Sequence, residues 1–210
     1  MPPPRKTNRE VEIKLAVSDL HTTKRAIKAL GASFHGRVFE ANTLYDTPHA
    51  DLRSRGRLLR VRTESPAPQT SRSSRNRIRR VVLTSKAPPP SQKRGSKMKS
   101  RYKERAEREV AARHTTRSWP AALRRLGLQP SFCYHKYRSS FHLGALHLDL
   151  DETPVGTFLE LEGRPAAIDR VASALGYTPS AYIRGTYWDL YSADCRRRGR
   201  EPRNMVFSKK

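Results

Sequence analysis

The chain has 210 residues, which is enough for one domain with a core that folds without disulfides or structural metals. Its formal net charge of +24 predicts an anionic partner such as nucleic acid, a polyphosphate or an acidic surface. No stretch approaches a membrane span and no apolar leader follows the Pro-rich start, so we expect a cytoplasmic protein with no membrane partner.

Residues 1–8 form a basic leader that we expect to be disordered. Beyond it, charged and apolar residues alternate in short runs, which is typical of strands with two unlike faces. The predicted strands are residues 10–15, 34–45, 58–62, 79–86, 102–110, 132–143, 146–151 and 158–162. Gly, Pro and capping residues delimit predicted helices at residues 20–30, 118–126, 165–175 and 179–195.

Two basic segments rich in Pro and Ser, at about residues 64–77 and 88–100, are predicted loops that could gate a site or contact polyanions. Residues 196–210 are a basic tail that we expect to be loosely held. The sequence therefore predicts one main domain over residues 9–195.

Many short strands with helices at their connections indicate an α+β fold, and closing the sheet into a barrel would leave no exposed edge. If helices cover the apolar faces outside, the charged faces line the interior. The charged residues on these faces are Glu10, Glu12, Glu107, Glu109, Asp149, Asp151, Glu160 and Glu162, together with Lys14, Arg60, Arg62, Lys86, Arg105, Lys136 and Arg138.

A barrel lined by both signs of charge needs ligands to balance it, because unpaired buried charge is very costly. Arginines bind phosphate oxygens in pairs, and carboxylates two residues apart are natural ligands for Mg²⁺ or Mn²⁺. This pattern predicts a metal-dependent site for a phosphate chain. A single strand of this kind is more often a solvated sheet face, but the recurrence along the chain argues against that explanation here.

These motifs resemble the CYTH superfamily, the triphosphate tunnel metalloenzymes, and most of all its bacterial members labelled class IV adenylate cyclase. The superfamily also includes thiamine triphosphatases and inorganic triphosphatases. The matching motifs run in the family's order over residues 9–192. They are Glu10-x-Glu12-x-Lys14, Leu44 to Pro48, Leu59 to Arg62, Thr84-x-Lys86, Arg105-x-Glu107-x-Glu109, Lys136-x-Arg138, Leu150 to Glu152 and Phe158 to Glu162.

The resemblance implies an eight-stranded antiparallel tunnel with helices packed outside. It implies phosphate binding by Lys14, Arg60, Arg62, Lys86, Arg105, Lys136 and Arg138. It also implies that one or two divalent metals, Mg²⁺ or Mn²⁺, are held by Glu10, Glu12, Glu107, Glu109, Glu160 and Glu162, with Asp151 as a further candidate. Lys14 and Arg62 are the candidate catalytic residues.

Three functions remain open from the sequence. The first is hydrolysis of an inorganic or organic triphosphate, the second is conversion of ATP to cyclic AMP and pyrophosphate, and the third is binding of polyphosphate or nucleic acid without catalysis. Carboxylates paired among the cations favour an enzyme, since they would repel a nucleic-acid backbone. The aromatic residues Phe34, Phe39, Tyr45 and Phe141 could stack on a base, but they are more typical of a core. We expect a monomer or a homodimer.

Overall fold

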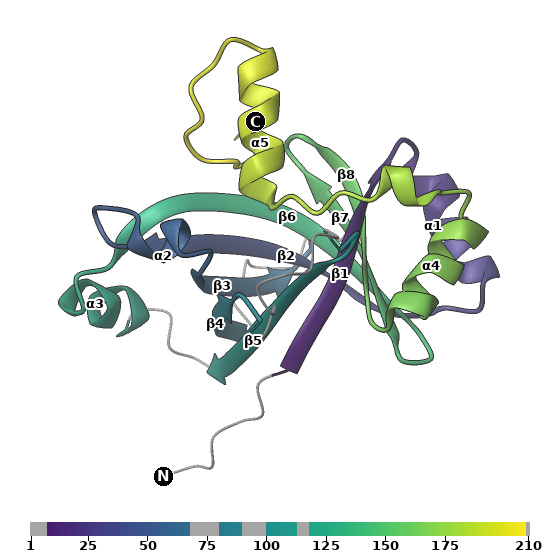
Figure 1. Ribbon diagram of the computed structural model, residues 1–210, viewed down its shortest axis with the longest axis horizontal. Coiled ribbons are helices and arrows are strands. Elements are labelled where there is room, and N and C mark those ends of the chain that lie inside the picture. Colours follow the sequence, from purple (N-terminus) through teal and green to yellow (C-terminus); the bar gives the residue numbers. More distant parts are fainter. Residues whose placement is uncertain (1–7, 68–79, 90–99, 113–117, 209–210) are drawn as a thin grey trace.

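Eight antiparallel strands close into a barrel, and the helices lie outside it (Figure 1), which confirms the predicted α+β architecture. This computed structural model describes residues 8–67, 80–89, 100–112 and 118–208. The strands are β1 (Asn8–Val17), β2 (Ser33–Asp46), β3 (Leu58–Pro66), β4 (Arg80–Ala87), β5 (Lys103–Ala112), β6 (Gln129–Leu143), β7 (Leu146–Thr153) and β8 (Gly156–Glu162). The helices are α1 (Leu20–Ala29), α2 (Asp51–Ser54), α3 (Ser118–Arg125), α4 (Pro165–Ala174), the 3₁₀ turn η1 (Pro179–Ala181) and α5 (Tyr187–Arg197).

The barrel closes through β1, which pairs with a strand on each side. The strand order is β1-β5-β4-β3-β2-β6-β7-β8, returning to β1. Glu12 lies where the two ladders overlap, since it is opposite Lys103 of β5 and opposite Glu162 of β8. Beyond that point, Ile183 takes the place of β5, and its backbone exchanges two hydrogen bonds with Lys14. The strand that carries the first charged motif is therefore held on both edges.

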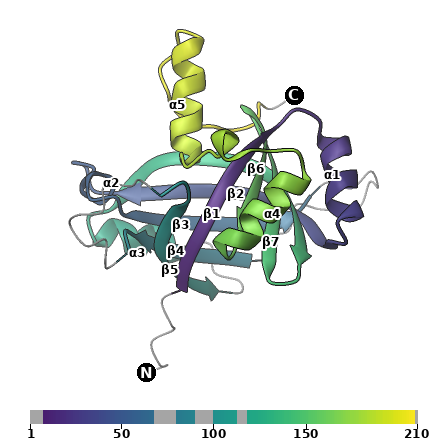
Figure 2. The same cartoon turned by 45° about the vertical axis from the view of Figure 1, so that its right-hand side comes forward.

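The apolar core lies outside the barrel in three separate clusters. The largest packs α1 and α4 against β1, β7 and β8, with Ile27 and Ile168 of the helices meeting Ile13, Leu148 and Leu161 of the strands. In Figure 1 and Figure 2 these two helices lie together at one end of the barrel, while α2 and α3 lie at the other. Because alternate residues of each strand face outward to these helices, the remaining residues must face inward.

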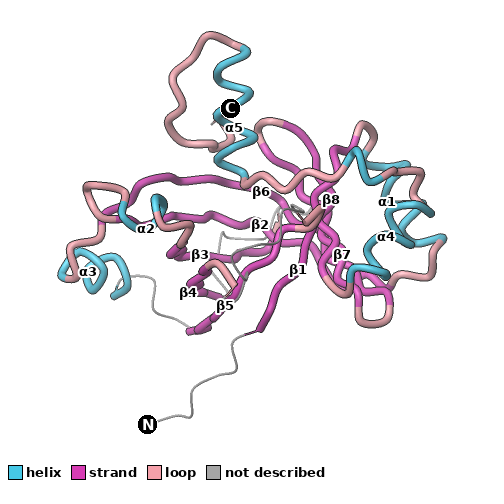
Figure 3. Tube along the Cα trace, viewed as in Figure 1, coloured by secondary structure: helices cyan, strands magenta, loops and turns pink. Residues whose placement is uncertain are grey.

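Smaller clusters anchor the other helices. Phe132 of β6 packs with Tyr187 of α5 and with Met205, and Leu123 of α3 packs on Val61 of β3. The tube view shows the strands as one body with the helices around its outer side (Figure 3). None of the helices in the described ranges combines the length and the apolar character needed to cross a membrane.

Two sequence predictions need correction, and one short helix was missed. The helix expected over residues 179–195 is broken into η1 and α5, because the segment between them pairs with Lys14. The tail is not loose near its end, since the backbone of Met205 bonds to Cys133 and His135. The short helix α2 was not predicted; it forms because the buried carboxylate of Asp46 accepts hydrogen bonds from the backbone N–H groups of Leu52 and Arg53.

Most of the predicted leader and of the two basic loops lies outside the described residues. In the first loop segment, residues 64–66 belong to β3, so the strand extends further than its alternation indicated.

Candidate active site

A cavity of about 560 Å³ lies inside the barrel, and its wall is dominated by charged side chains. The predicted site residues that line it are Glu10, Glu12, Lys14, Arg60, Arg62, Lys86, Arg105, Glu107, Glu109, Lys136, Arg138, Glu160 and Glu162. Asp151 is the predicted site residue that the lining does not include. Residues from six strands are thus brought to a single cavity.

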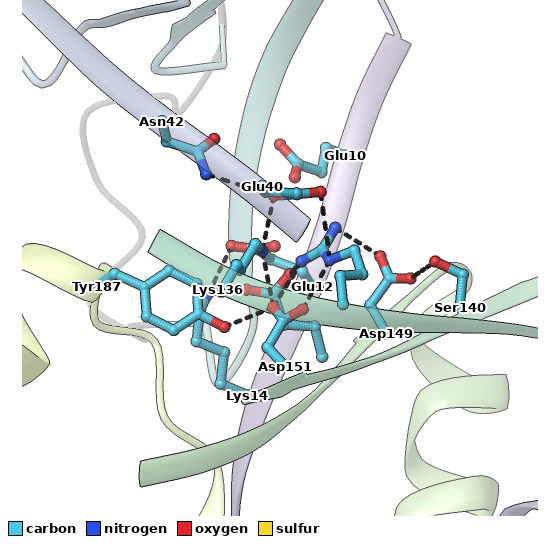
Figure 4. A network of polar contacts seen from close by, with 12 residues as sticks. Glu10, Glu12, Lys14, Glu40, Asn42, Lys136, Ser140, Asp149, Asp151 and Tyr187 are labelled. Carbon is cyan, nitrogen blue, oxygen red and sulfur yellow. Dashed lines mark hydrogen bonds and ion pairs between the residues drawn. The ribbon is translucent and has the colours of Figure 1, made fainter. Parts of the chain in front are cut away.

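Asp151 lies beneath the cavity wall, fully buried, and holds several groups at once (Figure 4). Its carboxylate accepts hydrogen bonds from Lys136 Nζ at 2.7 Å, Arg138 Nε at 2.7 Å and the Tyr187 hydroxyl at 2.6 Å. A carboxylate with this many donors has little capacity left for a metal ion. The contacts indicate that Asp151 positions two cations of the cavity wall.

Glu40 is a second buried carboxylate with the same arrangement, and the strand patterns did not predict it as a site residue. Its oxygens lie 3.2 Å from Arg62 Nη1, 3.5 Å from Lys136 Nζ and 3.8 Å from Arg138 Nε. Although burial acts to raise it, these three cations hold the pKa of Glu40 below its ordinary value. The arginines and Lys136 therefore rest on a layer of compensating negative charge.

A different part of the cavity is rich in carboxylates. Lys86 forms ion pairs with Glu10 and with Glu107, the latter at 3.2 Å. The second oxygen of Glu10, Oε2, is buried without a hydrogen-bond partner. Burial and the nearby charge of Glu10 raise the pKa of Glu162 to about 8, and none of the described cations forms an ion pair with it.

An unpartnered buried oxygen and a carboxyl group with a raised pKa are what an oxygen-binding divalent cation would relieve. The donor set of Glu10, Glu107 and Glu162 therefore fits Mg²⁺ or Mn²⁺ by its chemistry. Among the residues described, no three His, Cys, Asp or Glu side chains already stand at metal-binding spacing. These residues therefore match a divalent cation in their charge and in the type of their ligand atoms.

Two lysines near Glu12 differ in their protonation. Lys14 Nζ lies 3.2 Å from Glu12 and 3.1 Å from Glu160; although burial opposes the shift, these carboxylates raise the pKa of Lys14, so it stays charged at neutral pH. Lys103 also pairs with Glu12, but burial and the nearby Lys14 lower the pKa of Lys103 to about 8. Lys103 therefore loses its proton more readily than Lys14.

Three residues at the site escaped the sequence analysis for different reasons. The alternation places Lys103 on one strand face with Arg105, but Lys103 was not predicted as a site residue. Glu40 also follows the period of its strand, but nothing in the sequence pairs it with Arg62. Tyr187, whose ring lies 5.0 Å from Lys136 Nζ and 5.5 Å from Lys14 Nζ, comes from α5, outside the strands whose alternation predicted the site.

The four aromatic residues considered for base stacking lie in different places. Phe141 is buried in the largest apolar cluster, as a core residue, with the exposed Phe34 against its ring. Phe39 contacts Tyr137 and His135. Tyr45 lines the cavity but also packs in the cluster beneath α3.

Comparison with known proteins gives a family and a fold. The CYTH domain family model matches residues 8–177. A "putative adenylate cyclase" from Vibrio parahaemolyticus has a TM-score of 0.67 at 21% identity, over 89% of this chain and 99% of that one. The PH1012 protein of Pyrococcus horikoshii OT3 has a TM-score of 0.64 at 23% identity, over 86% and 98%.

A third structure, from Hippeastrum, is described as a "putative adenylyl cyclase" that "reveals a dominant" triphosphatase activity. It has a TM-score of 0.52 at 17% identity, over 92% of this chain and 97% of that one. At these identities the solved structures establish a shared fold. Among curated proteins, none matches this chain.

The contacts of Asp151 predict that the variant Asp151→Asn loses about 3 kcal/mol of unfolding free energy, because the buried cations Lys136 and Arg138 each lose one of their counter-charges. Urea unfolding followed by circular dichroism measures this. The matched control is the neighbouring Glu152→Gln, whose partner Arg37 lies 2.9 Å away at a partly exposed site, and it should change the free energy by about 1 kcal/mol or less. Equal stability of Asp151→Asn and the control would contradict the positioning role.

The raised pKa of Glu162 predicts a pH dependence of stability in metal-free protein. Between the ordinary value of 4.5 and about 8, the folded state holds a proton that the unfolded state has released, so wild-type stability falls as pH rises through this window. Glu162→Gln lacks this titration. We expect the melting temperature of the wild type, relative to that of the variant, to decline from about pH 5 to pH 8 in the presence of EDTA. A constant difference would show that the pKa is not raised.

Proposed function

The chain belongs to the CYTH domain family, and on that premise we propose that it is a divalent-metal-dependent enzyme that cleaves a phosphoanhydride bond of a triphosphate. The family is in general one of metal-dependent enzymes that bind triphosphates. The observation that carries the proposal is the convergence of the predicted cations and carboxylates on one cavity. Inorganic triphosphate and an organic triphosphate are both candidate substrates.

The cations of the cavity would bind the phosphate oxygens. Arg60, Arg62 and Arg138 offer planar groups of N–H donors, and Lys136 adds a point charge. Glu40 and Asp151 hold three of these four cations in place before substrate arrives. Fixed donors that meet the charge developing in the transition state lower the barrier, because they need no reorganisation during the reaction.

The carboxylates would hold the metal. We assign Glu10, Glu107 and Glu162 as the principal ligands, with Glu12, Glu109 and Glu160 as further candidates. When bound, Mg²⁺ or Mn²⁺ would supply charge neutralisation at the phosphate oxygens. Asp151 is more simply explained as the support of Lys136 and Arg138.

Lys14 would contact the substrate as a charged group. Its raised pKa keeps its proton in place at neutral pH, so it serves as a hydrogen-bond donor to phosphate and not as a base. Its position between Glu12 and Glu160 limits its movement. Lys86 and Arg105 are the other predicted phosphate-binding cations that line the cavity.

The adenylate cyclase reaction remains the alternative, because it would use the same phosphate contacts. Incubating the purified protein with tripolyphosphate or ATP, with Mg²⁺ or Mn²⁺, distinguishes the candidates. Release of orthophosphate supports the proposed hydrolysis, and formation of cyclic AMP with pyrophosphate supports the cyclase. Tight binding without turnover of either compound would instead indicate a binding module and would refute the proposed catalysis.

The variant Glu12→Gln should lower metal-dependent turnover by about 100-fold or more, because the carboxylate at the closure of the barrel loses its charge. Steady-state assays of phosphate release measure the effect, and circular dichroism checks that the fold is retained. Glu104→Gln is the matched control, since Glu104 is on the same pair of strands but bonds to the exposed Arg9. Full activity in Glu12→Gln would remove this residue from the site.

The variant Arg62→Ala should raise KM and lower kcat together, the latter by about 100-fold, because its guanidinium would contact phosphate in the ground state and in the transition state. The control is Arg37→Ala, which removes an arginine that pairs with Glu152 and stacks on Tyr137, away from the cavity lining. Equal kinetic constants for the two variants would argue against phosphate binding by Arg62.

A further inference from the structure

Most of the excess positive charge of this chain lies outside the cavity. The cavity lining has nearly as many carboxylates as lysine and arginine side chains, so its charges largely cancel. The formal net charge of the whole chain is nevertheless +24. The proposed catalytic site therefore leaves unexplained the anionic partner that this charge indicates.

A group of arginines lies on a part of the chain that projects from the barrel. Helix α5 packs against β6 by its first turns, where Trp188 and Tyr191 contact Phe132. The other end of α5 points away from the strands in both views (Figure 1, Figure 2), and the chain then returns to β6 at Met205. We call residues 194–204 the arginine arm; its arginines are Arg196, Arg197, Arg198, Arg200 and Arg203.

The arginine arm has a defined backbone structure although it projects from the barrel. Cys195 is buried, and its carbonyl oxygen accepts a hydrogen bond from the backbone N–H of Arg200 at 2.9 Å. This bond closes a turn at Gly199, whose φ of +62° favours glycine. On the returning segment, the backbone N–H of Arg203 donates to the hydroxyl of Tyr191 at 3.4 Å. A preorganised arm lowers the entropic cost of binding a partner.

The stability of α5 accounts for only some of these arginines. Arg197 and Arg198 each pair with Asp194 at 2.8 Å, and cations near the end of a helix complement its dipole. Arg200 and Arg203 lie beyond the end of the helix, with exposed side chains. Among the described residues, Asp194 is the carboxylate that forms ion pairs with the arm. The guanidinium groups of Arg200 and Arg203 are therefore available to an external anion.

The composition of residues 192–204 indicates which kind of anion the arm would bind. The segment has no aromatic residue on which an unpaired base could stack, and no large apolar residue that could enter a lipid bilayer. Arginine instead binds phosphate oxygens through its planar set of N–H donors. The five arginines outnumber the two carboxylates of the arm, Asp194 and Glu201, so the arm carries the excess positive charge that a phosphate backbone attracts.

We propose that the arginine arm binds the phosphate backbone of a duplex nucleic acid without reading its base sequence. Contacts to the backbone position a protein on a duplex but carry no sequence information. Each arginine that neutralises a phosphate releases counterions, so binding through the arm weakens as the salt concentration rises. This surface lies outside the cavity, and the inference does not depend on the proposed function.

Fluorescence anisotropy of the full-length protein with labelled DNA and RNA duplexes, at several KCl concentrations, tests this surface. The variant carries Arg196→Gln, Arg200→Gln and Arg203→Gln, all at exposed positions. We expect its affinity for DNA at low salt to fall by about tenfold or more. The slope of log K against log [KCl] should become shallower by about 2–3, because each phosphate contact contributes about 0.9. The single variant Arg200→Gln should lower the slope by about 1.

The matched control removes three positive charges from α1, which lies apart from α5 in both views. Its substitutions are Lys24→Gln, Arg25→Gln and Lys28→Gln, and they lower the net charge by the same amount. We expect this control to change the affinity for the duplex by about twofold or less. Both triple variants should keep the Kd of the wild type for tripolyphosphate in EDTA, because none of the substituted residues lines the cavity. Circular dichroism checks that each variant is folded.

Equal losses of duplex affinity in the arm variant and in the α1 control would overturn the proposal, as would a wild-type protein that does not bind either duplex. Binding of long-chain polyphosphate or of phosphatidylserine vesicles that depends on the arm, without such binding of a duplex, would also overturn it. A loss of affinity and of salt dependence in the arm variant alone supports it. Absence of turnover with tripolyphosphate or ATP would refute the proposed function and leave this inference standing.

Discussion

Pairing of opposite charges inside the barrel is the constraint on which the rest of this structure depends. Each ionised group taken out of water costs several kcal/mol unless a partner compensates it. Glu40 and Asp151 lie at the back of the wall and hold Arg62, Lys136 and Arg138 from behind. The cations can therefore face the cavity, charged and fixed, without a ligand present.

This polar interior is possible because the apolar surface of the strands is buried elsewhere. Three clusters outside the barrel, beneath α1 with α4, beneath α3 and beneath α5, replace the single central core of an ordinary domain. Packing in these outer clusters is also linked to the position of the charged groups inside the barrel. Tyr187 belongs to an outer apolar cluster, yet its hydroxyl reaches Asp151 within the ion network.

The chemistry of the cavity wall changes from one part of the cavity to another. Carboxylates gather around Lys86, arginines gather over Glu40 and Asp151, and aromatic rings gather beyond Arg60. The adjacency of Tyr187 and Trp188 in α5 means that one helix start serves both regions.

The sequence by itself determined the strands, the α+β barrel and most of the charged lining, because residues two apart on a strand must share a face and the charged motifs repeat that period. The roles of the lining residues and the domain boundaries stay predictions. Only the tertiary structure decided which carboxylate supports which cation, since Glu40 meets Arg62 and Lys136 through the pairing of β2 with β3 and β6. It also decided the break before α5, where Ile183 pairs with Lys14 and Tyr187 and Trp188 reach the cavity. Contacts between distant segments depend on how the barrel closes, and local periodicity carries no information about that closure.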